Sequence, residues 1–420
     1  MNILVALFAL FFIAAIAVFL YRLKLLNHKD TVSAATLIAV LTFFLLSATA
    51  VIITGLNGLN IRIPGIDVII TILSFLGVLA IVVIAHELGH FATAKWSSVK
   101  VEEFGIGYPP RLFGIKRGET LYSINAIPLG GFTKMSGEED PKAERSLASK
   151  NAGTRVLVLS AGSIMNAILP FLLLAIAYMV PHDMATARVV VDEVSANSPA
   201  SQAGIMAGDV ILEVNDHKVS YNGDVAYYIQ MYLGTRITML IEHADGTRDV
   251  VEVVPRWRPP PGDGAVGIGT INEDLVVEKK GEPLFRAISK GAVQAVENMV
   301  IFKNSILSMF IGTASISDVT GPVGIAEISG EVARAGWYTF LQWTALLSLN
   351  LAIINILPLP ALDGGRIAFV VIEWVRGGKR ISPRTEALVH AMGFLLLMAI
   401  VAAITFQDIV HIAQSGSVLP

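Results

Sequence analysis

The clearest chemistry in the sequence lies in His86-Glu87-Leu88-Gly89-His90. On a helix, residues four apart share a face, so both imidazoles can bind one metal ion while Glu87 reaches the water on it. The motif ends the apolar run VIITILSFLGVLAIVVIA, where ionisable groups cost about 2–3 kcal/mol each to insert in a membrane. We therefore predict a zinc site with Glu87 as the catalytic base. The alternative is two histidines hydrogen-bonded within a helix interface.

A tetrahedral zinc site needs a third protein ligand and leaves its fourth position for water. The candidate is Asp363, in Asn355-Ile-Leu-Pro-Leu-Pro-Ala-Leu-Asp363-Gly-Gly. Pro358 and Pro360 exclude a regular helix there. Non-helical backbone at membrane depth persists only where it is buried or lines a wet cavity. Asp363 and His86 also lie toward the same end of their apolar segments, so their depths agree. The alternative is an aspartate that stabilises a turn.

The elements that must position these residues are membrane helices. The chain has 420 residues, of which 54% are hydrophobic and 15% charged, against about 25% charged in soluble domains. There is no cysteine, so a metal must be held by His, Asp or Glu, and the net charge of −3 gives no reason to expect nucleic acid. Six segments have the roughly 20 apolar residues that a spanning helix needs: Ile3–Tyr21, Ala34–Ile53, Val68–Phe91, Val156–Val180, Tyr338–Leu357 and Leu388–Phe406.

Basic residues orient this set. The first segment lacks a basic flank before it and a cleavage site after it, so we expect a retained helix rather than a signal peptide. Three loops on one side of the six-helix arrangement are basic, and that side should be cytoplasmic. The segment from 181 to 337 is then expected on the outer face. The basic residues are Arg22, Lys24 and Lys29; Lys95, Lys100, Lys150 and Arg155; and Arg376, Lys379, Arg380 and Arg384.

The outer segment changes character over residues 185–273. Alternating apolar residues lead into SPASQAGIMAGDVILEVN, and strand-like stretches flank the Asp245-Gly246 turn. This pattern resembles a PDZ domain, with GAVGIG at 264–269 similar to the strand that binds a peptide carboxylate. The resemblance implies a peptide ligand held by strand addition. The alternative is a β-rich module that only packs or gates. Residues 283–312 predict an amphipathic helix, which lies on the membrane surface or covers the module.

The HELGH motif, the NILPLPALDGG motif and the intervening PDZ-like module together resemble the site-2 protease family of intramembrane zinc metalloproteases, and most closely its bacterial RseP-like branch, the regulator of sigma-E protease. The resemblance covers about residues 68–410, with the catalytic core in 66–180 and 338–410. It implies Zn²⁺ held by His86, His90 and Asp363, with Glu87 catalytic. It also implies Asn355 and Pro358 as substrate-binding residues. Two helices within residues 1–55 and the single PDZ-like module depart from the best-known members.

The loop after the HELGH motif predicts a cytoplasmic, membrane-associated β-hairpin. Tyr122–Ile127 alternates, and a sharp turn is expected at Pro128-Leu-Gly130-Gly131-Phe132. Similar family segments form a hairpin that dips into the membrane and pairs with the substrate, which implies substrate contacts for Gly130, Gly131 and Phe132. The alternative is an ordinary cytoplasmic loop.

Two further segments match family motifs. Gly162-Ser-Ile-Met-Asn166 has small-residue spacing that we interpret chiefly as close helix packing. Thr320-Gly321-Pro322-Val323-Gly324 suggests no physical role by itself.

The sequence thus predicts a polytopic α-helical membrane protein with an inserted extracytoplasmic α+β PDZ domain. It should be a multi-pass protease of a bacterial inner (cytoplasmic) membrane, with its active site toward the cytoplasm. Its partners should be the lipid bilayer and single-span substrates, such as an anti-sigma factor or a remnant signal peptide. A silent scaffold and a metal transporter are the rival classes. An intact Glu87 argues against the first, and the few polar groups in helices one, two and six argue against the second.

Overall fold

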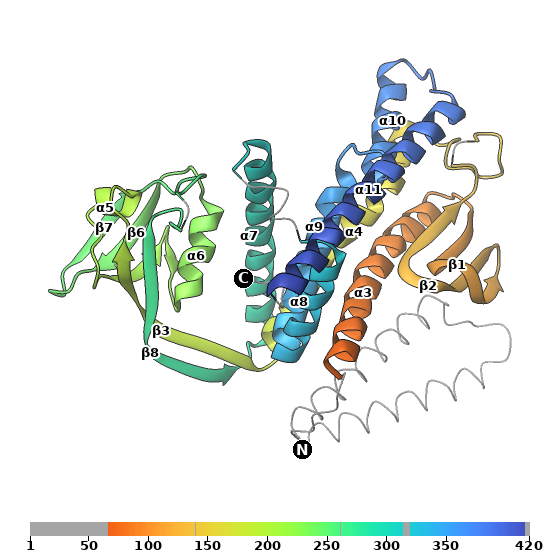
Figure 1. Cartoon of the computed structure of the whole chain (residues 1–420). Helices are drawn as coiled ribbons and strands as arrows, with labels where there is room; N and C mark the ends of the chain where they lie inside the picture. Colours follow the sequence, from red (N-terminus) through yellow and green to blue (C-terminus); the bar gives the residue numbers. More distant parts are fainter. Residues whose placement is uncertain (1–65, 139, 261, 314–319, 416–420) are drawn as a thin grey trace. The chain divides into compact units, whose positions relative to one another are not determined.

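The computed structural model describes residues 66–138, 140–260, 262–313 and 320–415 (Figure 1). The chain forms two compact units, which are described separately. The first unit runs to Pro170 and resumes at Thr320, and the second runs from Phe171 to Val319. The spans expected at Ile3–Tyr21 and Ala34–Ile53 lie outside the described residues.

Helices make up most of the first unit. Four helices in the described part of the chain are long and apolar enough to cross a membrane, and they match the four expected segments that fall there. They are α3 (Ile66–Trp96), α4 (Ala152–Met179, whose last part belongs to the second unit), α9 (Trp337–Ile356) and α11 (Pro383–Ser415); two further helices are α8 (Pro322–Ala335) and α10 (Asp363–Val375).

Close backbone contacts fix α3 among its neighbours. A Cβ added at Gly89 would lie 2.3 Å from the carbonyl oxygen of Ala161 in α4, so only glycine lets these helices approach so closely. On α8, a Cβ at Gly330 would meet Oγ1 of Thr71 in α3 at 2.2 Å. These contacts hold α3 between α4 and α8, and the α3 helix carries the HELGH motif in its last three turns.

The predicted hairpin is present as two long strands, β1 (Val101–Arg117) and β2 (Thr120–Met135). The β1 segment Phe104–Ile106 has partners on both sides, in 122–124 and in 131–133 of β2. Among the residues that the structure describes, the 131–135 segment of β2 therefore pairs with β1 on one side only. The sharp turn expected around Pro128–Phe132 is present within β2. Ile124 and Gly131 both lie opposite Ile106, and the pairing runs in opposite directions before and after this point, so the chain reverses between them.

The proline-rich segment also differs from expectation. We placed Asn355 on irregular backbone, but it lies in the last turn of α9, which continues to Ile356. A proline restricts chiefly the residue before it, and here Leu357 takes the extended conformation while the preceding turn stays helical. After the non-helical residues 357–362, Asp363 begins α10, a helix that the sequence analysis did not anticipate.

The Thr320–Gly324 segment gains a structural role. The backbone N–H of Gly321 and of Gly324 donate to the carboxylate of Asp408 in α11, at 3.2 and 2.8 Å. Asp408 is buried, so the first turn of α8 neutralises part of the cost of a carboxylate in an apolar helix. A Cβ at Gly321 would lie 2.7 Å from Oδ2 of Asp408, which explains the glycine.

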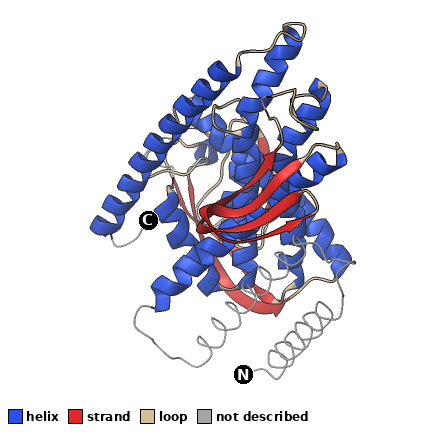
Figure 2. Ribbon diagram, turned by 90° about the vertical axis from the view of Figure 1, so that its right-hand side faces the viewer, coloured by secondary structure: helices blue, strands red, loops and turns tan. Residues whose placement is uncertain are grey.

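The second unit holds one six-stranded sheet (Figure 2). The strand order is β7-β6-β4-β3-β8, with β5 paired to β4. Its core is formed by inward-facing residues of the strands, among them Val189, Ile211 and Met239. The elements are β3 (His182–Val194), α5 (Pro199–Gln202), β4 (Val210–Val214), β5 (His217–Lys218), α6 (Asn222–Met231), β6 (Ile237–Glu242), β7 (Arg248–Val253), β8 (Ile268–Lys280) and α7 (Leu284–Phe310).

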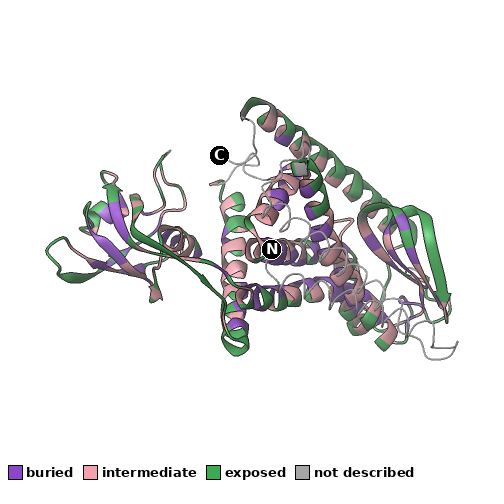
Figure 3. Cartoon of the chain, turned by 90° about the horizontal axis from the view of Figure 1, so that it is seen from below, coloured by how far each residue is buried: buried purple, intermediate pink, exposed green. Residues whose placement is uncertain are grey.

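Two features of this unit extend the expected module. The strands β3 and β8 continue past residues 185 and 273 as an antiparallel ribbon that ends with His182 opposite Lys280, and β8 is largely exposed along it (Figure 3). Helix α7 packs against α6, where Asn304 donates to the carbonyls of Gln230 and Met231 at 2.8 and 2.9 Å. The sequence left two positions open for this helix, on the membrane surface or against the module, and the structure shows the contact with the module.

Candidate metal centre

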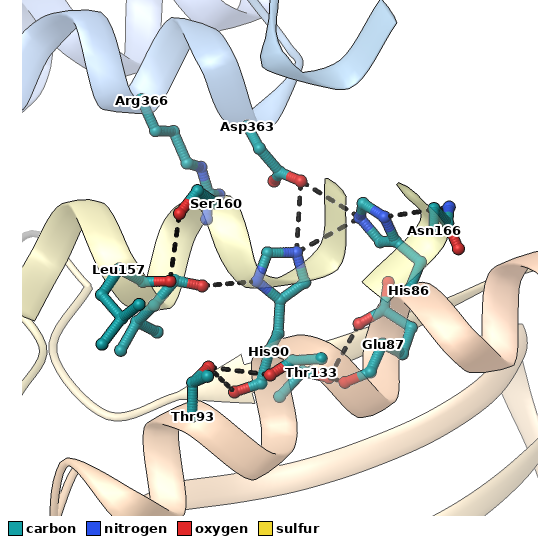
Figure 4. A network of polar contacts seen from close by, with 12 residues as sticks. His86, Glu87, His90, Thr93, Thr133, Leu157, Ser160, Asn166, Asp363 and Arg366 are labelled. Carbon is teal, nitrogen blue, oxygen red and sulfur yellow. Dashed lines mark hydrogen bonds and ion pairs between the residues drawn. The ribbon is translucent and has the colours of Figure 1, made fainter. Parts of the chain in front are cut away.

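Three side chains from α3 and α10 converge on one point (Figure 4). Nε2 of His86 lies 3.1 Å from Oδ2 of Asp363, and Nε2 of His90 lies 3.2 Å from the same oxygen. The two Nε2 atoms are 3.2 Å apart. Both histidines are buried, and the Asp363 side chain is 21% exposed. The three residues predicted as ligands are thus brought together, although His90 and Asp363 are 273 positions apart in the sequence.

The spacing fits a zinc ion. Zinc–nitrogen and zinc–oxygen bonds of about 2.0–2.2 Å in a tetrahedral site place neighbouring ligand atoms roughly 3.3–3.5 Å apart. The three separations here, 3.1 to 3.2 Å, are close to that value. Two imidazoles and one carboxylate are also a donor set typical of catalytic zinc, which keeps one position open for water. His86, His90 and Asp363 supply this donor set.

The other ring nitrogens of the histidines face away from this point. Nδ1 of His90 lies 2.8 Å from the carbonyl oxygen of Val158 in α4. Nδ1 of His86 lies 3.4 Å from the side-chain amide of Asn166, about two turns further along α4. Between them, a Cβ at Gly162 would lie 2.4 Å from Nε2 of His90 and 2.7 Å from Nε2 of His86. Helix α4 therefore forms one wall of the centre.

Glu87 lies beside the ligands but outside their triangle. Oγ1 of Thr133, in β2, lies 2.7 Å from Oε2 of Glu87 and 3.1 Å from its carbonyl oxygen. Gly131 brings the strand close, because a Cβ there would lie 3.1 Å from Cγ of Glu87. The carboxylate is thus held by the hairpin, while the metal ligands are held by helices.

Asp363 is positioned by the first turn of α10. The glycines after it allow this turn to fold onto the preceding loop, since a Cβ at Gly364 would lie 2.0 Å from the carbonyl oxygen of Leu357. Farther along α10, Glu373 accepts from Arg155 of α4 at 2.6 Å and from Arg380 at 3.0 Å. The pair with Arg155 fastens α10 to the start of α4, the helix that also contacts both histidines.

A cavity of about 350 Å³ opens at the ligands. Six of its lining residues were predicted as site residues: His86, Glu87, His90, Gly131, Phe132 and Asp363. The predicted residues Gly130, Asn355 and Pro358 are not among those that line it. Sequence reasoning missed several other lining residues, which are Tyr108, Thr133, Lys134, Met135, Glu138, Leu159, Ala361 and Arg366. Ala361 lies within the NILPLPALDGG motif, two residues before Asp363, so that motif could have identified it. The other seven belong to no metal or catalytic motif, and no local signal marks them.

The profile of peptidase family M50 matches residues 74–400. The chain belongs to this family. The relatives include a provisionally named zinc metalloprotease of Clostridium acetobutylicum, 34% identical over 82% of this chain and 98% of its own. Zinc metalloprotease RasP of Oceanobacillus iheyensis is 28% identical over 81% of this chain and 98% of its own. A solved PDZ domain of an SdrC-like protein from Listeria monocytogenes is 20% identical over 20% of this chain and 88% of that chain, with a TM-score of 0.18.

Membership in the M50 family, whose members are site-2 proteases, confirms the family predicted from the two motifs. The chain is a multi-pass membrane protein and a zinc-dependent metalloendopeptidase. The family match begins at residue 74, so the two expected amino-terminal spans lie outside it, as the sequence resemblance implied.

Proposed function

We propose that this M50 protein hydrolyses peptide bonds within or beside the spanning segments of other membrane proteins. The observation that carries the proposal is the convergence of His86, His90 and Asp363 on one point from α3 and α10. Helix α3 has the length and composition of a membrane span, and the ligands lie toward one end of it. A peptide bond cut at this centre would therefore lie at the membrane.

The chemistry divides between the metal and the protein. His86, His90 and Asp363 would hold a zinc ion, which would supply a Lewis acid for the scissile carbonyl and lower the pKa of a water. Glu87 accepts the proton of the attacking water and delivers it to the leaving amine, as general base and then general acid. Thr133 fixes the carboxylate for this transfer, since its hydroxyl contacts Oε2 at 2.7 Å.

The substrate is held as an extended strand. A helical substrate hides its carbonyls in hydrogen bonds, and an extended chain in a membrane cavity needs partners for its polar groups. The Gly131–Met135 segment of β2 supports this proposal, because it lines the cavity and, within the described part of the chain, pairs with β1 on one side only. Asn355 lies just before the loop that leads to Asp363 and Pro358 lies within it, and we assign both residues contacts with the substrate chain beyond the cavity.

The inserted sheet acts as a PDZ domain on the outer face. There it binds an extended peptide or excludes large extracytoplasmic domains, so that single-span proteins already shortened by another protease reach the metal. Its support is the single sheet with the GAVGIG segment leading into β8. Anti-sigma factors and remnant signal peptides are substrates of this kind. The protein would reside in a bacterial cytoplasmic membrane with its zinc toward the cytoplasm.

The test is reconstitution of the purified protein in liposomes with a single-span peptide. We expect one zinc per chain, cleavage within or next to the span, loss of cleavage after chelation and its return with added zinc. A zinc-replete protein that leaves every single-span peptide intact would contradict the proposal. Zinc flux into the liposomes would instead indicate transport. Against transport, His86, His90 and Asp363 form the one three-ligand group among the described residues, with no second such group to continue a path.

A further inference from the structure

A histidine that binds zinc through Nε2 carries its proton on Nδ1, and that N–H needs an acceptor to fix the tautomer and the ring orientation. For His90 the acceptor is the carbonyl oxygen of Val158, at 2.8 Å. Since both Nε2 atoms face Asp363, the Nδ1 atom of His86 must find its own acceptor on the opposite side of the ring.

Asn166 is the group at that position. Its side-chain nitrogen lies 3.4 Å from Nδ1 of His86, but two N–H groups cannot bond each other. Its amide oxygen is buried and has no hydrogen-bond partner, and the residue is fully buried. A half-turn of the amide exchanges its oxygen and nitrogen without changing the shape of the side chain. The oxygen then accepts from Nδ1–H of His86, and the buried acceptor is satisfied.

The backbone of α4 holds this amide in place. The carbonyl oxygen of Asn166 accepts from Oγ of Ser348 in α9 at 2.9 Å, and Ser348 is fully buried. One turn earlier, Gly162 faces both histidine rings so closely that any Cβ would overlap their Nε2 atoms. The four-residue spacing thus puts a glycine where the ligand nitrogens need room and an asparagine where one ring needs an acceptor. Packing alone, which we had favoured for this motif, does not require the amide.

We infer that Asn166 is a positioning residue that holds His86 in the tautomer and orientation that bind zinc through Nε2. The inference rests on the proposed zinc function, and it assigns the residue no contact with the substrate. When a metal-binding histidine loses the hydrogen-bond partner of its other ring nitrogen, the affinity for the metal falls by about 10- to 100-fold.

The experiment measures zinc affinity of the purified full-length protein by competition with a fluorescent chelator, and the visible spectrum of the cobalt-substituted form. Asn166→Leu should bind zinc about 10- to 100-fold more weakly and change the cobalt spectrum. Asn166→Asp, which restores an acceptor, should bind zinc within about threefold of the wild type. Thr344→Val is the matched control, because it removes a buried hydroxyl bonded within its own helix, and it should leave both readouts unchanged.

Wild-type affinity and spectrum in Asn166→Leu would overturn the inference. If Asn166→Leu does not accumulate, Asn166→Asp decides: zinc binding tenfold or more below wild type would overturn it equally. Failure of the proposed function looks different, because a wild-type protein that binds zinc but leaves every single-span peptide intact would contradict that function and leave this inference standing.

Discussion

The hydroxyl of Thr133 contacts the carboxylate of Glu87 at 2.7 Å, and so connects an edge of the hairpin to the helix that carries two metal ligands. The contact joins the Gly131–Met135 segment, which we propose holds the substrate, to Glu87, which we propose transfers the proton. Gly131, two residues earlier on the same face of β2, leaves the room that the contact needs. A substrate strand paired beside this segment would therefore act on the same element that orients the base.

Thr133→Val should lower kcat while leaving zinc content unchanged. A hydrogen bond to a charged group contributes about 1.5–3 kcal/mol, so its loss predicts a decrease of at least about tenfold. Thr133→Ser keeps the hydroxyl and should retain most of the activity. Cleavage of a reconstituted single-span peptide measures the effect, and an unchanged kcat in Thr133→Val would show that Glu87 needs no such support.

Asp363→Ala should reduce both zinc occupancy and cleavage, because two imidazoles alone hold the ion poorly. Metal analysis of the purified protein gives the occupancy. The matched control is Asp140→Ala, which removes an exposed carboxylate bonded to the backbone of Lys142. If Asp363→Ala keeps wild-type zinc content and loses only activity, Asp363 lies near the metal without binding it.

The metal centre could be predicted from sequence because its signals are local. The HELGH motif sets two ligands on one helical face, and the prolines and glycines around Asp363 indicate unusual backbone in an apolar segment. The four described membrane helices followed from apolar length alone. The contacts of Thr133 with Glu87 and of Asn166 with His86 join residues 46 and 80 positions apart. The periodic pattern of apolar residues in the sequence does not predict such contacts, because they depend on how separate elements pack.

The error of local structure in the proline-rich segment has a physical cause. Proline was taken to disrupt several preceding residues, yet α9 continues to Ile356, and only Leu357 changes conformation before Pro358. In β2, by contrast, Pro128 and the two glycines after it do turn the chain, since Ile124 and Gly131 lie opposite the same residue of β1, Ile106. In α9, packing of the helix outweighs the local tendency of the prolines to break it.

Asp408→Leu should destabilise the protein, because the N–H groups of Gly321 and Gly324 would lose their shared acceptor. Each buried donor left without a partner costs about 1–3 kcal/mol. Thermal unfolding in detergent should show a lowered midpoint, and Asp408→Asn, which keeps one acceptor oxygen, should show a smaller decrease. Equal midpoints for Asp408→Leu and the wild type would mean that this carboxylate does not hold α8 against α11.

The orientation in the membrane can be read by cysteine labelling, because the chain has no cysteine of its own. Ser382→Cys, in the exposed turn before α11, should react only after the membrane is permeabilised. Ala244→Cys, in the exposed turn between β6 and β7, should react from outside in intact cells. The opposite pattern would invert the proposed topology and place the zinc centre toward the outer face.

The most direct test of the account is the Glu87→Gln variant, measured for zinc content and for cleavage of a single-span peptide in the same liposomes. Glutamine has nearly the same shape as glutamate but cannot accept the proton. The account predicts one zinc per chain, as in the wild type, and a loss of cleavage of at least about a thousandfold, near the upper part of the range for a general base. Cleavage by Glu87→Gln at a rate near that of the wild type would contradict it.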